Sequence, residues 1–494
     1  MIKEKISLIE ERFEILRRRS GLIIAPIIFL IIYFLPISIL NEQTHSLAAL
    51  VSLIVILWLT EALPLYITGL LVPVLLIVLG ITSAQKAFSP FADPIMFLFI
   101  GAFILAKAIQ LHGLDKRFAY TVLTMKLVNG NPSRIMFAYG AVCCTISMWI
   151  SNTATTAMMF PIGLAIISML YSKEGNRVRE EYATGMMLMC AFASSVGGLA
   201  TPVGTPTNLI GIGFIERQLG RHIAFFEWVA FAMPIVIVMY LALFLYLNYF
   251  CGVGKTHIEG LHDLLEQEQK KLGALSVAER NTLIAFGVTV LLWILPGIFA
   301  LTIGDTHPVT VAYSKQLPES VVALIGAVLL FFLPAQSKNE GKKKYVMNIS
   351  HAVQIDWGVL ALYGGGITLG QMVFETKLAE IIGSQLAGFI PTDGIGLLAI
   401  TSALATVTSE LTSNVSSANM IVPLVIVLAQ HSAFQAAIAA TMAASLGFML
   451  PISTPTNAIV YSSGYVPLGK MIRYGLLLDL VGFVIIVAGI SLLI

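Results

Sequence analysis

The chain has 494 residues, of which 57% are hydrophobic and only 11% are charged. Soluble domains carry about 25% charged residues, so this composition excludes an ordinary soluble protein and predicts a polytopic membrane protein. The formal net charge of +2 argues against a nucleic-acid-binding protein, which would present a concentrated basic face. The cysteines at positions 143, 144, 190 and 251 lie in or beside apolar runs, so we expect buried thiols and no disulfide scaffold.

Eleven apolar stretches are long enough to cross a bilayer as helices. The first 20 residues are charged and precede a full-length span without a cleavage site, so we interpret residues 1–20 as a cytoplasmic amphipathic lead-in and not as a signal peptide. Two longer apolar regions, 134–171 and 393–430, are each interrupted by Ser-Asn and predict re-entrant hairpins. The predicted spans cover residues 21–40, 44–61, 62–81, 94–111, 183–215, 224–251, 281–302, 318–334, 353–375, 433–461 and 468–494.

Lysine and arginine are distributed unevenly between the predicted loops. With the N-terminus inside, the inner segments hold 23 of these residues and the outer segments hold 5. This bias predicts a cytoplasmic N-terminus, an outside C-terminus and hairpins that enter from opposite sides. The charged segment 252–280 is expected to form an amphipathic stretch on the inner membrane face or against the protein.

The two halves of the chain contain an internal repeat. SNTATTAMMFP (151–161) aligns with SNVSSANMIVP (413–423), and PVGTPTNLI (202–210) aligns with PISTPTNAI (451–459). Each half has five full crossings, an odd number, so the second copy is predicted to be inverted in the membrane. Inverted repeats with discontinuous helices are typical of secondary transporters, whose binding site lies where the breaks meet.

The helix ends at these breaks offer chemistry for ions. Free carbonyls at a helix C-terminus suit a small hard cation such as sodium, whereas free N–H groups at a helix N-terminus suit a carboxylate. None of the four motifs contains Lys or Arg. A duplicated tip suits a ligand with two similar ends, such as a small dicarboxylate. A channel and an intramembrane hydrolase are the competing functions, but no His or Lys adjoins the tips to serve as a catalytic base, and we predict no enzyme.

Two charged residues inside apolar segments stand out. Glu410 precedes the second tip and is either a structural acceptor for nearby N–H groups or a proton-linked site. Lys107 either contributes a functional buried charge or extends its ammonium to the inner face. Asp356 and Glu61, at span boundaries, are expected to cap helix ends.

Together with WLTEALPLYITGLL (58–71) and DWGVLALYGGG (356–366), the paired tips and the two TPTN breaks resemble the divalent anion/sodium symporters, which carry di- and tricarboxylates. The resemblance implies an all-α homodimer of eleven transmembrane helices and two hairpins per chain, which works by an elevator mechanism in the cell (inner) membrane. It implies sodium-coupled transport of the succinate, malate and 2-oxoglutarate class, with citrate a further candidate and no covalent cofactor. The implied scaffold covers 21–133 and 281–385, the transport domain covers 134–251 and 386–494, and 252–280 links them.

The resemblance also implies particular site residues. Sodium would bind at two positions, and the substrate carboxylates would lie between the tips. Two residues depart from the family pattern. Val415 stands where the family has Thr, so one hydroxyl donor is missing. Lys107 stands where an apolar residue is expected, and if its fixed ammonium replaced a mobile sodium, the protein would be a sodium-independent dicarboxylate exchanger. The implied sets are Ser147, Ser151, Asn152 and the Gly204 carbonyl for the first sodium; Ser409, Thr412, Asn414 and the Ser453 carbonyl for the second; and Asn152, Thr153, Asn414, Val415, Pro206, Thr207, Pro455 and Thr456 for the substrate.

Overall fold

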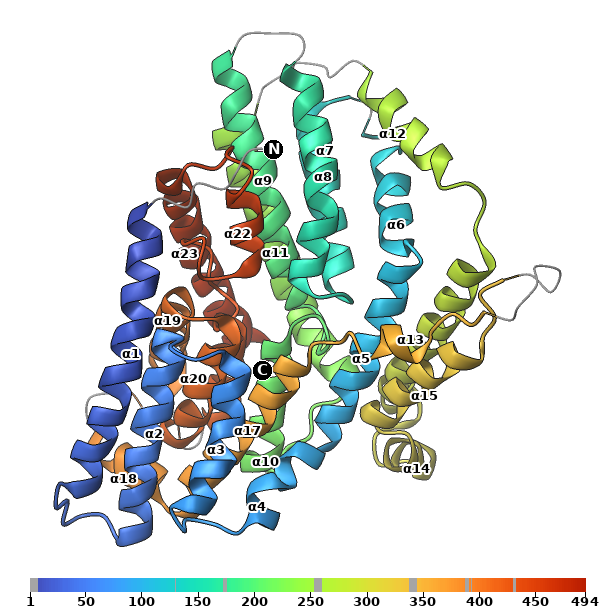
Figure 1. Cartoon of the computed structure of the whole chain (residues 1–494). Coiled ribbons are helices and arrows are strands. Elements are labelled where there is room, and N and C mark those ends of the chain that lie inside the picture. The colour runs from blue at the N-terminus through green and yellow to red at the C-terminus, as the bar shows by residue number, and fades with distance from the viewer. Residues whose placement is uncertain are drawn as a thin grey trace.

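The computed structural model describes residues 8–128, 130–171, 176–252, 260–336, 344–386, 391, 393–429 and 432–494. Its regular elements in these ranges are helices, and the only β-type pairing there is one isolated bridge between Pro334 and Tyr345 (Figure 1). The predicted all-α class is therefore confirmed. Residues 1–7 of the expected lead-in and 253–259 of the expected linker lie outside the described residues.

The helices follow the apolar segments of the sequence closely, and α5 has the bounds predicted for its span. In chain order they are α1 Leu8–Phe34, α2 Glu42–Thr60, α3 Leu65–Val78, α4 Ala84–Phe88, the 3₁₀ turn η1 Ser89–Ala92, α5 Pro94–Leu111, α6 Leu114–Leu123, α7 Pro132–Ser147, α8 Asn152–Tyr171, α9 Asn176–Gly198, α10 Pro206–Leu219, α11 Phe225–Cys251, α12 Leu261–Lys271, α13 Val277–Ile303, α14 Pro308–Gln316, α15 Glu319–Phe332, α16 Ile349–Ala352, α17 Trp357–Glu375, α18 Leu378–Leu386, α19 Gly394–Leu411, α20 Asn414–Leu428, α21 Ala433–Ala443, α22 Pro455–Tyr461 and α23 Leu468–Leu493.

Within the described residues, eight helices are long and apolar enough to cross a membrane, or nine if α14 and α15, which meet at a bend of 57°, count as one span. Two of the eight, α8 and α19, are arms of the predicted hairpins. The predicted number of eleven spans also counts crossings assembled from shorter helices, and it stays a prediction. The structure differs from the expectation at the N-terminus, because α1 runs without interruption from Leu8 to Phe34 and includes residues 8–20 of the lead-in.

Both predicted hairpins are pairs of helices joined by a short turn. In the first hairpin, α7 ends at Ser147 and α8 begins at Asn152. In the second, α19 ends at Leu411 and α20 begins at Asn414. Ser413 caps the start of α20, because its side chain accepts a hydrogen bond from the Ser416 N–H. The helix–turn–helix form predicted for 134–171 and 393–430 is thus confirmed. The two pairs occupy the upper and lower parts of the molecule in Figure 1, in line with entry from opposite sides.

Each TPTN motif ends a break in a longer helical segment. The break between α9 and α10 covers 199–205, and the break between α21 and α22 covers 444–454. A residue before proline is held in an extended conformation, and proline favours the first position of a helix. Thr205 and Thr454 accordingly have nearly the same extended backbone (φ −141°, ψ 143° and φ −143°, ψ 146°), and α10 and α22 begin at the following Pro206 and Pro455.

The broken helices of each half pack on the other half of the chain. α22 lies against α8 and α9, and α10 lies against α20 and α21. At one of these crossings Gly211 faces Thr441, and a methyl group on the glycine would overlap the threonine side chain. The two predicted repeats therefore interlock at the breaks.

A second set of helices packs mainly among its own members and touches the second hairpin where α17 meets α20. α3 packs on α17, and α5 packs on α15. Gly69 and Gly365 bring the backbones of α3 and α17 together, because a Cβ on Gly365 would overlap the Gly69 carbonyl. Asp356 caps the start of α17 by accepting the Val359 N–H at 3.2 Å, and Glu61 caps the end of α2, as predicted.

The charged stretch before α13 is helical, as its pattern predicts. α12 buries Leu261 and Leu265 and packs against α6. Arg117 of α6 fixes the following turn by donating to the Leu272 carbonyl at 3.1 Å and to Glu279 at 2.6 Å. This segment therefore packs on the protein, one of the two placements that the sequence left open.

Candidate functional site

The first hairpin tip is closed by a hydrogen bond between two predicted sodium ligands. The buried Ser147 hydroxyl donates to the Asn152 amide oxygen at 2.7 Å. The tip rests on the first break, since the Thr201 hydroxyl donates to the Met148 carbonyl at 2.5 Å. Ser151 is exposed and its hydroxyl accepts the Ala154 N–H at 3.4 Å.

The second tip repeats this arrangement. The buried Ser409 hydroxyl contacts the Asn414 amide oxygen at 2.8 Å and the Ala444 carbonyl at 2.7 Å. The Asn414 amide nitrogen donates to the Ser445 carbonyl at 3.4 Å, so this tip rests on the second break. Thr412 is buried, and its hydroxyl donates back to the Thr408 carbonyl of its own helix.

Two asparagines that were not among the predicted site residues hold the breaks in shape. Asn208 donates to the carbonyls of Gly198 at 3.0 Å and Thr201 at 2.8 Å, and Asn457 donates to those of Gly447 and Leu450, both at 3.0 Å. Both asparagines are fully buried. They are the fourth residues of the duplicated TPTN motifs, and this duplication was the available sequence signal.

Glycine is required where the first tip meets the first break. A Cβ on Gly198 would overlap the Asn152 amide oxygen, and a Cβ on Gly204 would lie 2.5 Å from the Gly198 carbonyl oxygen. In the second half, a Cβ on Gly447 would lie 3.0 Å from the Asn414 amide oxygen. The first site is therefore packed more tightly than the second.

The predicted substrate residues lie at the starts of four helices. Thr207 and Thr456 are buried, Pro206 is half-buried, and Pro455 is exposed. The Thr456 hydroxyl lies 2.8 Å from the Thr454 hydroxyl and 3.3 Å from the Ser195 hydroxyl of α9. α22, which follows the second break, thus contacts α9 of the first half, and it also packs on α8, which begins at the first tip.

At the tips themselves the side chains are more open. Thr153 is exposed, whereas Asn152, Asn414 and Val415 are half-buried. The Asn152 amide nitrogen makes no hydrogen bond with any described residue, so it remains available as a donor. Val415 packs against two separate apolar clusters of buried residues.

Glu410 is a buried structural acceptor, one of the two roles that the sequence left open. Its carboxylate accepts the Met449 N–H at 2.8 Å and the Ser453 hydroxyl at 2.7 Å. The same hydroxyl lies 3.0 Å from the Glu410 carbonyl. Glu410 therefore fixes the position of Ser453, whose carbonyl is one of the predicted ligands of the second sodium.

Lys107 lies on α5, four residues before the helix ends at Leu111, which is about 6 Å along its axis. The side chain is half-buried, and no carboxylate among the described residues forms an ion pair with it. Its neighbours Leu105 and Ala108 pack in a cluster with residues of α13 and α15. Its predicted role as a charge substitute stays a prediction.

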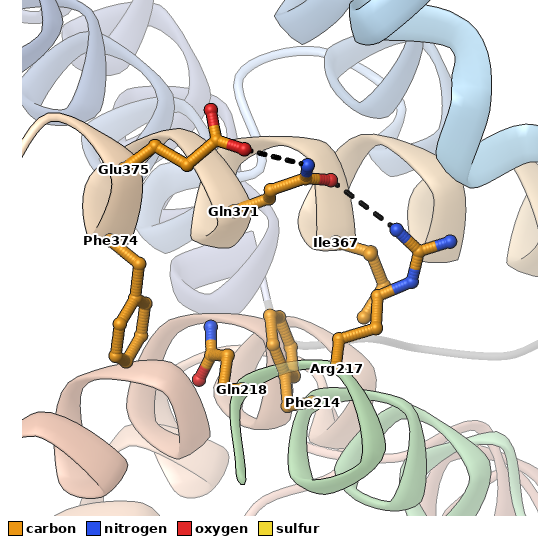
Figure 2. Close-up of a pocket in the computed structure, with 7 residues that line it drawn as sticks. All are labelled: Phe214, Arg217, Gln218, Ile367, Gln371, Phe374 and Glu375. Carbon is orange, nitrogen blue, oxygen red and sulfur yellow. Dashed lines mark hydrogen bonds between the residues drawn. The ribbon is translucent and has the colours of Figure 1, made fainter. Parts of the chain in front are cut away.

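A cavity of about 290 Å³ lies between α10 and α17, and none of the residues that line it belongs to the tips (Figure 2). Arg217 extends along it and donates to Gln371 at 3.3 Å and to Asp93 at 2.7 Å. The Tyr363 hydroxyl donates to the other oxygen of Asp93 at 3.2 Å. This network joins α10 to α5 and α17, and no sequence pattern indicated it. The lining residues are Phe214, Arg217, Gln218, Ile367, Gln371, Phe374 and Glu375.

The described residues contain no group of three or more His, Cys, Asp or Glu side chains that could hold a metal ion. A cation at the tips would therefore be bound by hydroxyl, amide and carbonyl oxygens. A polytopic helical protein with two matching sets of broken helices and neutral oxygen-rich tips belongs to the class of secondary membrane transporters.

Comparison with known proteins identifies the family within this class. The family model described as the sodium:sulfate symporter transmembrane region matches residues 17–493, and the chain belongs to this family. It is an integral membrane transporter and not an enzyme. The chain is 30% identical over 483 residues to the sodium-dependent dicarboxylate transporter SdcS of Staphylococcus saprophyticus, covering 94% of this chain and 89% of the relative. It is 32% identical over 478 residues to SdcS of Staphylococcus aureus, with the same coverage.

Two solved structures share the fold at low sequence identity. The YdaH transporter of Alcanivorax borkumensis superimposes with a TM-score of 0.54 at 13% identity, covering 97% of both chains. MtrF of Neisseria gonorrhoeae, described as one of a class of antimetabolite efflux pumps, superimposes with a TM-score of 0.55 at 14% identity, covering 83% of this chain and 82% of its own. These likenesses concern the fold alone.

Proposed function

We propose that the protein is a sodium-coupled symporter of small dicarboxylates of the succinate, malate and 2-oxoglutarate class, with citrate a further candidate. The observation that carries this proposal is the duplicated tip, in which a buried serine hydroxyl contacts an asparagine amide oxygen at 2.7 Å in one half and 2.8 Å in the other. The names of the SdcS relatives, sodium-dependent dicarboxylate transporters, support both the ion and the substrate class.

Each tip offers a set of neutral oxygens to one sodium ion. In the first, Ser147, Ser151, Asn152 and the Gly204 carbonyl are the ligands. Ser147 and Asn152 oxygens are within hydrogen-bond distance of each other, so both can reach the same ion. A bound sodium would bridge the two oxygens in place of this hydrogen bond, and the Ser147 hydroxyl, which keeps its proton, would turn away from Asn152.

The second sodium uses Ser409, Thr412, Asn414 and the Ser453 carbonyl in the same way. The Ser409–Asn414 contact is the counterpart of the one in the first tip. The Glu410 carboxylate behind Ser453 adds negative charge close to this position. Because the effective dielectric constant of the protein interior is lower than that of water, this negative charge attracts a cation to the position.

The substrate is placed between the tips with one carboxylate at each. Asn152 and Thr153 serve the first carboxylate, and Asn414 serves the second. Charge-assisted hydrogen bonds from amide and hydroxyl donors, together with the N-terminal ends of the tip helices, favour an anion without a permanent cation. Thr207 and Thr456 with the adjoining Pro206 and Pro455 line the flanks. Val415 offers no hydroxyl, so the second carboxylate has one donor fewer than the first.

Transport follows an elevator mechanism in a homodimer, with the N-terminus inside and the C-terminus outside. Residues 134–251 and 386–494 move against the scaffold formed by 21–133 and 281–385. The Arg217–Asp93 contact, at 2.7 Å, crosses this boundary. It must break when the transport domain moves, which makes it a conformational lock of one end state.

The test is uptake of labelled succinate, malate, 2-oxoglutarate and citrate by purified protein in vesicles. A sodium gradient should drive accumulation, and its replacement by choline should abolish it. Asn152→Ala and Asn414→Ala should each abolish uptake, whereas Asn281→Ala, a buried scaffold asparagine that donates to the Pro334 carbonyl, should retain it.

The competing function is sodium-independent exchange, and the same vesicles test it. Uptake that requires dicarboxylate preloaded inside the vesicles and does not depend on sodium would overturn the symport proposal. In that case Lys107→Leu should restore net flux or weaken substrate binding at low sodium. Near-wild-type uptake by either tip variant would instead overturn the two-tip site.

A further inference from the structure

The first helix reaches the second hairpin tip through one arginine. The Arg17 guanidinium donates from one nitrogen to the Leu411 carbonyl at 3.1 Å and from another to the Glu61 carboxylate at 3.1 Å. The Arg17 and Glu61 side chains are only 13% and 22% exposed, so salt and water screen this ion pair weakly. The guanidinium therefore lies between a carboxylate of the proposed scaffold and a carbonyl of the proposed transport domain.

The position of Arg17 is fixed by the close approach of α1 and α2. A Cβ on Gly21 would overlap the Thr60 hydroxyl, so glycine lets the two helices meet at this level. Gly21 lies about one helical turn after Arg17, and Glu61 directly follows Thr60. Glu61 has a left-handed backbone (φ 46°), which residues other than glycine rarely adopt. The packing of α1 on α2 thus holds Arg17 and Glu61 together as one unit.

The carbonyl that Arg17 binds lies at the second tip, beside the proposed second sodium. Leu411 is the last residue of α19, and the last carbonyls of a helix lack partners within it. They form the negative end of the helix dipole, which attracts cations. The next residue, Thr412, is a proposed sodium ligand, and Ser409, another, lies two residues before Leu411. Arg17 thus brings a permanent positive charge to the helix end that the second sodium would otherwise neutralise.

We propose that Arg17 is a tethered cation of the second tip, which occupies the carbonyl end of α19 in this end state and weakens binding of the second sodium. This inference rests on the proposed function. Because Arg17 is held by the scaffold and Leu411 moves with the transport domain, the contact exists in one end state only. The second sodium is released more readily in this state and bound more tightly once the tip has moved away. Arg17 is a positioning residue, since it acts through the tip and contacts neither sodium nor substrate.

Hydrogen exchange of the purified full-length protein, without sodium or substrate, tests the contact itself. Arg17→Gln removes the guanidinium and should raise the exchange rate of the backbone amides of residues 411–417 several-fold. Arg19→Gln is the matched control, because Arg19 is an exposed residue of the same helix and makes no hydrogen bond or ion pair with the described residues. It should leave exchange at the tip unchanged. Equal exchange at the tip in the two variants overturns the proposal.

Sodium titration of the same proteins, followed by the thermal midpoint, tests the competition. Arg17→Gln should lower the sodium concentration for half-maximal stabilisation several-fold, since the competing charge is gone. Glu61→Gln should raise it, because the guanidinium keeps its charge and loses the carboxylate that partly neutralises it. Arg17→Lys should lie between the wild type and Arg17→Gln, because it keeps the charge without the planar fork of donors. A merely structural contact would change the thermal midpoints without moving the sodium titrations in opposite directions.

The double variant Arg17→Gln/Glu61→Gln keeps the test decisive if a single variant folds poorly. It leaves no unpaired charge and should show the same low sodium half-saturation as Arg17→Gln. If both variants that lack the Arg17 charge bind sodium like Arg19→Gln, the proposal is overturned. Absence of sodium binding in the wild type contradicts the proposed symport, and the hydrogen-exchange result then decides by itself whether Arg17 holds the tip.

Discussion

Replacing Asn208 by alanine should destabilise the backbone of the first break, residues 199–205. Asn208 is fully buried and donates to the Gly198 carbonyl at 3.0 Å and the Thr201 carbonyl at 2.8 Å. A buried carbonyl that loses its donor costs roughly 1–3 kcal/mol, so two of them cost about 2–6 kcal/mol. The two lost hydrogen bonds hold the backbone close to Gly204, whose carbonyl is a proposed sodium ligand. Sodium binding at the first tip should therefore weaken as well.

The second half supplies a matched variant, because Asn457 makes two equivalent bonds at 3.0 Å. Asn457→Ala should lower the thermal midpoint of detergent-purified protein by a similar amount. Asn208→Asp keeps the shape but turns a carboxylate oxygen toward two carbonyls, so it should destabilise more than alanine. Asn281→Ala removes a single bond in the scaffold, at 2.7 Å, and should cost about half as much.

The assay is thermal unfolding in sodium chloride and in choline chloride, followed by uptake in vesicles. Wild-type and Asn281→Ala proteins should both be stabilised by sodium, whereas the two break variants should lose most of this stabilisation. If Asn208→Ala keeps the wild-type midpoint and the full sodium response, these hydrogen bonds do not hold the site. Loss of the sodium response in Asn281→Ala would also refute the reasoning.

Three further predictions concern single side chains. Gly198→Ala should weaken sodium binding more than Gly447→Ala, because a methyl group on Gly198 would overlap the Asn152 amide oxygen, whereas one on Gly447 would make a tight contact of 3.0 Å with the Asn414 amide oxygen. Equal sodium titrations would contradict this. Val415→Thr should change dicarboxylate affinity several-fold, since one hydrogen bond is worth roughly 1–2 kcal/mol, and unchanged competition curves would mean that position 415 does not face the ligand. His222 lies in the loop between α10 and α11, where hydrogen bonds to Glu216 and Glu319 raise its pKa to about 10. The bound proton should stabilise the fold fully below about pH 6.5 and be lost as the pH rises through about 10. His222→Gln should flatten this part of the pH profile of the thermal midpoint, and an unchanged profile would rule out His222 as its source.

Much of the site was predictable because its signals are local. Proline and the residue before it restrict the backbone on their own, so the breaks at Thr205 and Thr454 follow from the motif. The tips follow from Ser-Asn pairs inside apolar runs, whose length no single crossing accommodates.

Contacts between distant segments were not predictable in this way. Asp479 lies in the apolar run of α23, and only the fold packs that helix against α19 and α11. Arg217 and Asp93 are 124 positions apart, and neither sits in a motif. The continuous α1 was missed because charged residues at the helix start resemble a separate surface segment, although charge does not itself end a helix.

The interlocking of the breaks also bears on how such a chain could have arisen. α22 buries its face on α8 and α9, while α10 buries its face on α20 and α21. A protein made of one half alone would expose both kinds of face to lipid. A second copy could cover these faces only if it inserted beside the first in the opposite orientation. The ancestor that fits this architecture is therefore a polypeptide that enters the membrane in both orientations and forms a dimer with itself. Fusion of the two copies would then have fixed one orientation for each.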